Sequence, residues 1–343
     1  MKLVVLSADR TLASGYAANL GDSFLTDALV QALSEEGATV EAVDFGGRRR
    51  EGYGARRSVS GFSGLARTIG SADAVVIGGG TLLQDDVGGR VGGLPRLMAV
   101  TSLLGWLLRT PVVFFGVGCD PVHRRVPRSL LRAALWRRRV WARDEQSMQR
   151  CSGLGVAAAS LSLGSDVSLL LADEIAAMRG GDGPNHGVVA LAKADSEGLT
   201  HPAVLEAVAR WGSLVFVQMF QDESVGDAST LSRPARNGFA RVTDGLSWRE
   251  AAAVVAGADV VIASRMHALY LALMAGTPAI PVGDLAKVRS FAREFGLSEP
   301  MEAADAMKSD PRVGDSAALD VAVARACTAL RELMDVLRSS VRS

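Results

Sequence analysis

Cysteine is scarce in this chain of 343 residues. Its three cysteines, Cys119, Cys151 and Cys327, lie far apart and form neither a CxxC motif nor a pairing with histidine. An odd and dispersed set argues against a disulfide framework and a zinc site, and it fits a reducing compartment. We therefore expect a cytoplasmic protein without a bound metal.

The chain also lacks an excess of either charge and any long uninterrupted apolar run. The 37 basic and 37 acidic residues give a formal net charge of zero, so nothing global indicates a nucleic-acid partner. The longest apolar region, residues 94–117, is interrupted by Arg96, Arg109 and Pro111, which argues against a membrane span. The first apolar residues are too few for a signal peptide and predict a strand over 2–7.

What is present is typical of a globular protein with two domains. Apolar residues make up 48% of the chain and charged residues 22%. Short apolar runs alternate with stretches of helical periodicity, which predicts parallel sheets wound on both faces. The expected strands begin at 2, 40, 74, 112, 140, 187, 214, 260 and 279, and helices are expected over 22–37, 201–211, 247–256 and 317–338.

The domain bounds follow from composition. Residues 46–61 are rich in Gly, Arg and Ser and predict a mobile loop, while the Gly- and Pro-containing run 180–185 predicts the linker. We expect an N-terminal Rossmann-like domain over 1–180 and a second over 186–316. A C-terminal helix over 317–343 follows them.

The strongest site signal lies in Asp259–Pro278. It predicts a buried strand, a polar turn carrying Ser264, Arg265 and His267, and an apolar helix ended by glycine and proline. Open α/β sheets bind anions at such strand ends, because free backbone N–H groups and the helix dipole face the ligand. Arg265 suits phosphate or carboxylate, and His267 titrates near neutral pH.

Three further motifs follow or open predicted elements. In Asn19-Leu20-Gly21-Asp22, Asp22 either only caps the helix, or Asn19 and Asp22 project into the site as acceptor ligands or a base. Gly78-Gly79-Gly80 follows a strand and allows close backbone approach, but it is not a GxGxxG fingerprint. The run Arg143–Ser147 follows another short strand, and Arg143 is a candidate ligand.

Seven arginines and the interleaved tryptophans Trp136 and Trp141 mark residues 123–141. Two interpretations stay open for residues 123–139. They form a solvated helix face, or they form a docking surface for an anionic membrane or polyanion.

Together these motifs resemble the polysaccharide pyruvyl transferase family. The resemblance rests on the four motifs above, on Gly276-Thr277-Pro278 and on Lys287. It implies a GT-B-like α/β fold, in which two Rossmann-like domains face a cleft. It also implies transfer of the enolpyruvyl unit of phosphoenolpyruvate onto two hydroxyls of a sugar, giving a cyclic ketal. An aromatic residue often precedes the family's lysine, whereas this chain has Gly283-Asp284-Leu285-Ala286 there.

The expected site combines this resemblance with the chemistry of the side chains. Its members are His267 and Asp22 as catalytic groups, and Ser264, Arg265, Lys287, Asn19, Gly21, Gly79, Gly80 and Arg143 as substrate-binding groups. His267 is the candidate acid for the methylene carbon, and Asp22 the candidate base for the acceptor. No cofactor beyond the phosphoenolpyruvate donor is expected. The acceptor, lipid-linked or soluble, and the oligomeric state are left open.

Two alternatives compete with this interpretation. A sugar-nucleotide glycosyltransferase of the same fold commonly holds the ribose with a carboxylate in its C-terminal domain, but residues 268–283 contain no acidic residue. The second is a non-catalytic sugar-binding relative, against which the presence of both Arg265 and His267 argues.

Overall fold

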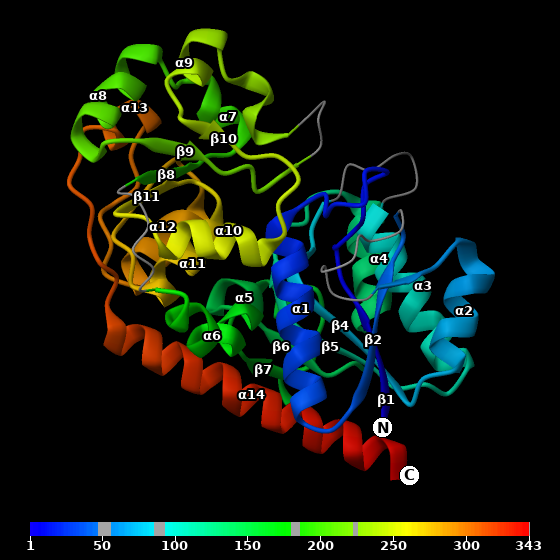
Figure 1. Cartoon of the computed structure of the whole chain (residues 1–343). Coiled ribbons are helices and arrows are strands. Elements are labelled where there is room, and N and C mark those ends of the chain that lie inside the picture. Colours follow the sequence, from blue (N-terminus) through cyan, green and yellow to red (C-terminus); the bar gives the residue numbers. More distant parts are fainter. Residues whose placement is uncertain (47–55, 86–92, 180–185, 222–225, 343) are drawn as a thin grey trace. The chain divides into compact units, whose positions relative to one another are not determined.

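The chain folds into two compact units, each built on its own sheet (Figure 1). The computed structural model describes residues 1–46, 56–85, 93–179, 186–221 and 226–342. Unit 1 comprises Met1–Gly15, Asp22–Leu170 and Val323–Ser343, and unit 2 comprises Tyr16–Gly21 and Leu171–Ala322. The units thus exchange two segments of chain, whereas the bounds expected from sequence were contiguous.

Unit 1 is a parallel sheet with helices on both faces. Its strands are β1 (Lys2–Leu6), β2 (Thr39–Asp44), β3 (Arg56–Ser58), β4 (Ala74–Leu83), β5 (Val112–Cys119), β6 (Val140–Ala142) and β7 (Leu161–Leu163). Its helices are α1 (Leu20–Glu35), α2 (Gly61–Gly70), α3 (Gly93–Leu107), α4 (Arg125–Leu135), α5 (Glu145–Gly153), the short η1 (Ala158–Ser160) and η2 (Val167–Leu171), and the later part of α14 (Ser316–Arg342). The strand order is β3-β2-β1-β4-β5-β6-β7.

The core of unit 1 lies on both faces of this sheet, because successive strand residues point to opposite sides. In β1, Leu3 and Val5 join a cluster that includes residues of α1 and α14. Val4 and Leu6 join the other cluster, with residues of α2, α3 and α4. Figure 1 shows these two groups of helices on opposite sides of the sheet.

Unit 2 contains a smaller parallel sheet. Its strands are β8 (Gly187–Ala190), β9 (Leu214–Phe216), β10 (Arg241–Val242), β11 (Val260–Ala263) and β12 (Ala279–Pro281). Its helices are α6 (Ala172–Ala177), α7 (Lys193–Glu197), α8 (His201–Trp211), η3 (Asp227–Thr230), α9 (Arg233–Asn237), α10 (Trp248–Ala256), α11 (Met266–Ala275), α12 (Ala286–Glu294) and α13 (Ala303–Ala306). The strand order is β10-β9-β8-β11-β12.

Each sheet has one point where the direction of strand succession reverses. It lies between β1 and β4 in unit 1 and between β8 and β11 in unit 2. Open parallel sheets bind ligands beside such points, at the carboxyl ends of the strands. The motif at Ser264–His267 directly follows β11, and Gly78–Gly80 lies within β4, so both are next to these positions.

The structure corrects several local predictions. The glycines Gly78, Gly79 and Gly80 lie inside β4 rather than in a loop after it. Asp22 is no helix cap, because α1 already begins at Leu20. Trp141 is fully buried, and its Nε1 donates to Glu332, so it is no surface residue.

Two predicted loops fall largely outside the described residues. The linker 180–185 lies wholly outside them, and so does most of the predicted loop 46–61. The described end of that loop contains strand β3 and the start of α2. None of the described helices is long and apolar enough to cross a membrane.

Candidate functional site

The polar turn after β11 is built by the apolar residues on either side of it. The strand Val260–Ala263 is fully buried, and α11 is buried along almost its whole length, ending at Gly276 in the left-handed conformation (φ 64°). Both ends of the polar turn between them are therefore held in place by buried elements. This predicted strand, turn and helix are all observed.

Ser264 connects the ends of β8 and β11, the two strands at the reversal point of unit 2. Its hydroxyl is buried and accepts a hydrogen bond from the Ala192 N–H at 2.8 Å, just beyond the end of β8. The N–H groups of Ser264 and Arg265 both donate to the Ala190 carbonyl, at 3.2 and 3.3 Å. The hydroxyl was expected to bind substrate. Its observed partner favours a role in holding the two strand ends together.

An ion pair with Asp227 orients the Arg265 side chain, and the sequence patterns did not predict this partner. The guanidinium Nε lies 3.1 Å from each carboxylate oxygen, and Nη2 also donates to Oδ1. The Asp227 side chain is fully buried, whereas that of Arg265 is 30% exposed. The acidic partner thus occupies the Nε–Nη2 edge, while part of the guanidinium side chain stays exposed.

Two backbone groups hold Asp227 in turn. The N–H groups of Met219 and Phe220 donate to its Oδ2 at 3.1 and 3.0 Å. Burial raises the pKa of Asp227, and the hydrogen bond and charge of Arg265 and these N–H groups oppose that rise. No sequence signal marked the residue, because it begins the short helix η3 and belongs to no periodic pattern.

Gly21 lies directly against the imidazole of His267. A Cβ added to Gly21 would stand 2.1 Å from His267 Nδ1 and 2.9 Å from Cγ, so only glycine fits there. Both residues belong to unit 2. Two motifs far apart in the sequence therefore meet in space, and the glycine of the first shapes the surroundings of the histidine of the second.

The segment carrying Gly21 is held by the loop after β9. The Leu20 N–H donates to the Met219 carbonyl at 2.7 Å, and the Gln221 N–H donates to the Ala18 carbonyl at 2.9 Å. The Asn19 side chain stabilises the turn into α1, since its Oδ1 accepts a hydrogen bond from the Gly21 N–H at 2.9 Å. The same loop supplies the N–H groups that hold Asp227, so one backbone segment positions Arg265 and His267 together.

The aromatic residues beyond His267 anchor α11 to α12. The His267 and Tyr270 rings are stacked with centroids 6.4 Å apart, and the centroids of the Tyr270 and Phe291 rings, the latter in α12, are 4.8 Å apart.

Lys287 is exposed in the first turn of α12. Lys193, which begins α7 just after β8, is likewise exposed near the reversal point and was not predicted.

A second cluster of expected residues lies in unit 1. A Cβ on Gly80 would stand 3.2 Å from Asp22 Oδ1, and a Cβ on Gly118 would stand 3.0 Å from Arg143 Nη2 and 3.1 Å from Thr81 Oγ1. The glycines of β4 and β5 thus make room for the charged side chains. Gly79 serves packing instead, since its added Cβ would stand 3.0 Å from Leu25 Cβ of α1.

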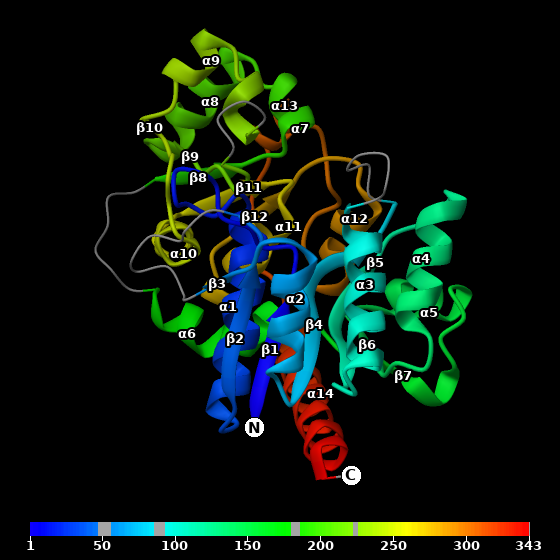
Figure 2. The same ribbon diagram turned by 90° about the vertical axis from the view of Figure 1, so that its right-hand side faces the viewer.

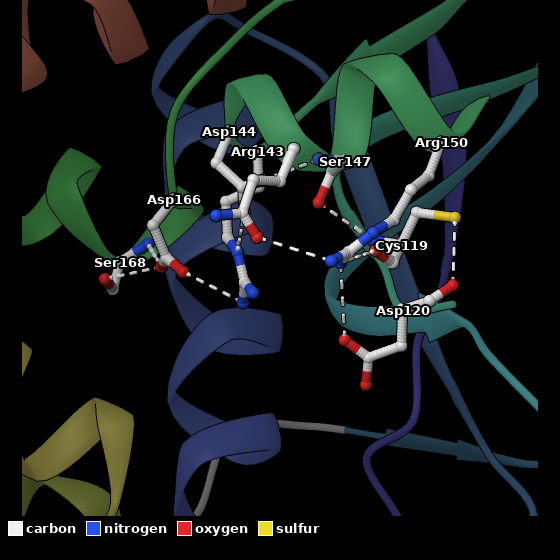
Figure 3. A network of polar contacts seen from close by, with 9 residues as sticks. Cys119, Asp120, Arg143, Asp144, Ser147, Arg150, Asp166 and Ser168 are labelled. Carbon is white, nitrogen blue, oxygen red and sulfur yellow. Dashed lines mark hydrogen bonds and ion pairs between the residues drawn. The ribbon is translucent and has the colours of Figure 1, made fainter. Parts of the chain in front are cut away.

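Figure 3 shows how Arg143 is held. Its Nη1 lies 3.5 Å from Oδ2 of the fully buried Asp166, and its Nε lies 3.4 Å from Asp144 Oδ2. Asp166 is itself fixed by the N–H and hydroxyl of Ser168, at 3.0 and 2.6 Å. Arg143 is only 9% exposed, so it is a well-positioned cation with one buried carboxylate partner.

The rest of the Arg143–Ser147 run is structural. Asp144 is the N-cap of α5 and accepts from the Ser147 N–H at 2.7 Å. The buried Ser147 hydroxyl accepts from the Cys119 N–H at 2.9 Å, which joins α5 to the end of β5 (Figure 3). This motif therefore combines one candidate ligand with two residues that place it.

The two clusters have different chemical capacities. The unit 2 cluster offers a half-exposed guanidinium, a helix N-terminus and an imidazole, which suits an anion and a proton transfer. The unit 1 cluster offers a carboxylate and a guanidinium, which suit hydroxyl groups. Among the described residues, no group of three or more His, Cys, Asp or Glu side chains is arranged to hold a metal ion.

Comparisons with known proteins identify the family and the fold. Residues 19–284 match a family model described as polysaccharide pyruvyl transferase. A comparison with curated proteins finds no match.

Solved structures of similar fold cover nearly the whole chain. UDP-N-acetylglucosamine 2-epimerase from Rickettsia bellii is 9% identical with a TM-score of 0.64, covering 100% of this chain and 97% of that one. The UDP-GlcNAc 2-epimerase from Neisseria meningitidis bound to UDP-GlcNAc is 9% identical with a TM-score of 0.60, covering 99% and 100%. A glycosyltransferase from Rickettsia africae is 10% identical with a TM-score of 0.56, covering 100% and 99%. At such identities the likeness concerns the fold alone, and it confirms the expected GT-B-like α/β fold.

Proposed function

The chain belongs to the polysaccharide pyruvyl transferase family, and we propose that it transfers the enolpyruvyl unit of phosphoenolpyruvate onto two hydroxyls of one sugar. The family makes the protein a transferase. The donor, the cyclic ketal product and the release of phosphate are the proposed part. The acceptor is a sugar of a glycan or glycoconjugate.

One observation carries the proposal: a half-exposed guanidinium and an imidazole stand together at the reversal point of unit 2. Arg265 is oriented by Asp227, and His267 by Gly21. Phosphoenolpyruvate carries a phosphate and a carboxylate close together, so it needs several cations and N–H donors. We assign these to Arg265, to the N-terminus of α11 and to Lys287 or Lys193.

The proposed reaction has two stages. A proton passes from His267 to the methylene carbon of phosphoenolpyruvate, which leaves an oxocarbenium-like centre at C2. A first sugar hydroxyl adds there and loses its proton to Asp22. A second hydroxyl then forms the other C–O bond as the C–O bond to phosphate breaks, and phosphate leaves. The two hydroxyls lose two protons in all. One of them makes up for the proton given to the methylene carbon, and the other leaves on the released phosphate, so protons and charges balance.

The residues of unit 1 are proposed as the acceptor side. Asp22 lies beside Gly80 of β4, and Arg143 lies beside Gly118 of β5, which pairs with Thr81, the residue after Gly80. Asn19 and Gly21 are proposed to contribute through the positioning of His267 rather than through the acceptor. General acid or base catalysis by one positioned group contributes about 10²–10⁴-fold in rate.

The decisive experiment offers the protein phosphoenolpyruvate and a panel of hexosides. Phosphate release and a mass gain equal to pyruvate minus water are followed in the same samples. UDP-GlcNAc with the same acceptors is the parallel arm. Turnover of the nucleotide sugar and none of phosphoenolpyruvate would move the protein to the glycosyltransferases.

Two variants separate binding from chemistry. In Arg265→Ala, calorimetry should show phosphoenolpyruvate affinity lowered by about 10–100-fold, as for a lost charged hydrogen bond of about 1.5–3 kcal/mol. His267→Gln should lose turnover more than affinity. If affinity and rate fall together in His267→Gln, the histidine is an anion ligand and not the acid.

The proposal also includes independence from cofactors. Arg265 and its neighbours supply the positive charge that a divalent ion would otherwise give, so activity should persist in a chelator. Loss of activity in the chelator with recovery on adding one metal ion would contradict this. A cytoplasmic location, expected from the cysteine content, belongs to the same proposal.

A further inference from the structure

An apolar groove runs between α3 and α4 on the surface of unit 1. Its volume is ≈ 760 Å³, and it is lined almost wholly by apolar side chains. The helices pack against each other, and Figure 2 turns them toward the viewer. The lining residues from α3 include Val100, Leu103 and Trp106, and those from α4 and its end include Leu130 and Trp136. This groove takes no part in the chemistry proposed above.

Exposed aromatic and aliphatic side chains mark the C-terminal ends of both helices. Trp106 is 62% exposed and Trp136 61%, and both line the groove. Leu107 and Leu108, just after Trp106, are exposed as well. Tryptophan is enriched where proteins meet the interface of a membrane, because its ring is apolar and its N–H is polar.

Arginines accompany both tryptophans at a conformational cost. Arg109 (φ 58°) and Arg137 (φ 55°) have left-handed backbone just beyond the two helix ends. Glycine is the usual residue in such positions, since a side chain there is strained. Arg137 also places its guanidinium over the Trp136 ring, 4.7 Å from the centroid. Glycine at these two positions would therefore be less strained than the arginines that stand beside the exposed tryptophans.

The stretch of sequence that contains α3 and α4 is strongly basic. Residues 93–139 contain nine arginines and a single acidic residue, Asp120, a net charge of +8 in a chain whose total is zero. At the groove itself, the Arg138 Nη2 donates to the Ser102 carbonyl at 2.7 Å. Its buried Nε has no hydrogen-bond acceptor among the described residues. Burial lowers the pKa of Arg138, so an anion at the groove would stabilise its charge.

We propose that the outer face of α3 and α4 docks the protein onto an anionic phospholipid bilayer. Trp106 and Trp136 enter the interface, and the arginines around them meet lipid phosphates. Charge complementarity selects this partner. A second copy of the chain would bring two arginine-rich helix pairs together, and a nucleic acid would leave the apolar groove and its exposed tryptophans uncovered.

The test is binding of the full chain to vesicles, without phosphoenolpyruvate or sugar, so that its outcome is separate from that of the proposed function. Vesicles of equal parts phosphatidylglycerol and phosphatidylcholine should bind the protein at low salt and release it as salt rises. Vesicles of phosphatidylcholine alone should bind it far less. Brominated acyl chains should quench tryptophan fluorescence, because Trp106 and Trp136 reach the interface.

Variants separate the apolar and charged contributions. Trp106→Ser with Trp136→Ser should lower partitioning at least about tenfold and remove the bromine quenching. Arg96→Gln, Arg132→Gln and Arg137→Gln together should lower it about 100-fold, which is about 1 kcal/mol per charge. The matched control changes Arg233, Arg236 and Arg241 of unit 2 to Gln, removes the same charge, and should leave binding nearly unchanged.

A second pair of variants guards against loss of folding. Arg109→Gly with Arg137→Gly relieves the left-handed strain, so the melting temperature should stay level or rise while vesicle binding falls. No binding to anionic vesicles at low salt would overturn the proposal. So would equal losses in the arginine triple variant and its control, or binding to heparin as strong as to vesicles without any bromine quenching.

Discussion

At the scale of single residues, Gly21 matters because it has no side chain. Its Cα lies against the His267 ring, and a methyl group would overlap Nδ1. In Gly21→Ala we therefore expect the imidazole to be displaced. A shift of about 1 Å in a catalytic group costs about 10²-fold in rate, so kcat should fall by about that factor. Phosphoenolpyruvate affinity, which we assign to Arg265, should change little in calorimetry.

The control for Gly21→Ala is a second helical glycine with open space beside it. A Cβ on Gly153 of α5 meets nothing within 4 Å. Gly153→Ala should leave activity unchanged and stability equal or slightly higher, since alanine favours helix by up to about 1 kcal/mol. Normal turnover in Gly21→Ala would show that the position of His267 does not limit the reaction.

The sequence indicated the candidate side chains of the site but not the residues that hold them. Arg265 and His267 stood out because they interrupt a strongly apolar strand–helix pair. Asp227, Ser264 as a strand-end tie, and Asp166 gain their roles only through the fold, since their partners are distant in the chain. Local patterns carry no information about such pairings.

Strand β3 shows the same limit at the scale of elements. Arg56, within the predicted loop 46–61, is buried between two carboxylates: its Nε lies 2.9 Å from Asp9 and its Nη2 2.5 Å from Asp27. Burial alone would lower the pKa of Arg56, but these acids raise it. Arginine and glycine content predicted a loop, because the buried acids that make the strand favourable follow β1 or belong to α1.

Breaking this buried triad should destabilise unit 1 strongly. Arg56→Met leaves Asp9 and Asp27 buried without their cation, and the loss of one partner from a buried ion pair costs about 3–5 kcal/mol. Urea denaturation measures it. Arg57→Met, the control in the same strand, breaks an ion pair with Glu41 that is about one-third exposed on each side and should cost about 1 kcal/mol or less. Equal losses in the two variants would contradict the burial argument.

Glu41 links three strands and makes their pairing dependent on pH. It lies 2.6 Å from Arg57 of β3 and 3.6 Å from Lys2 of β1. The hydrogen bond from Arg57 lowers the pKa of Glu41 from its ordinary 4.5; burial opposes this, and the charges of Arg57 and Lys2 add to it. A carboxylate with a lowered folded pKa stabilises the fold above its unfolded pKa and loses that effect as pH falls through the folded value.

The measurement compares wild type with Glu41→Gln by urea denaturation at several pH values. The stability difference should be present at neutral pH and shrink as the pH falls below about 4.5. A difference that stays constant with pH would mean that the ion pairs add nothing and that only packing was changed.

At the scale of the whole molecule, the units share two helices. Helix α1 begins with Leu20 and Gly21 in unit 2 and continues in unit 1, and α14 begins in unit 2 and ends in unit 1. Apolar periodicity predicted both helices and both sheets, because strands and amphipathic helices are local patterns. The exchange of segments was not predicted, since it depends on backbone bonds such as that between Leu20 and Met219.

The later part of α14 covers one face of the unit 1 sheet. Leu333 is fully buried there, in a cluster with β1, β4 and α1. Removing its side chain leaves a cavity between helix and sheet, and Leu333→Ala should cost about 2–5 kcal/mol in the free energy of unfolding. Val321, on the same helix and 60% exposed, provides the control, and Val321→Ala should change stability by about 0.5 kcal/mol or less.

The same variant tests where the donor binds. Arg265, Asp227, His267 and Gly21 all belong to unit 2, whereas Leu333 belongs to unit 1. Below its lowered melting temperature, Leu333→Ala should therefore bind phosphoenolpyruvate with wild-type affinity in calorimetry. Unchanged stability would mean that α14 is not part of the core of unit 1. Weakened donor binding in a variant that is still folded would mean that the donor site depends on unit 1, and the assignment of the donor to unit 2 alone would fail.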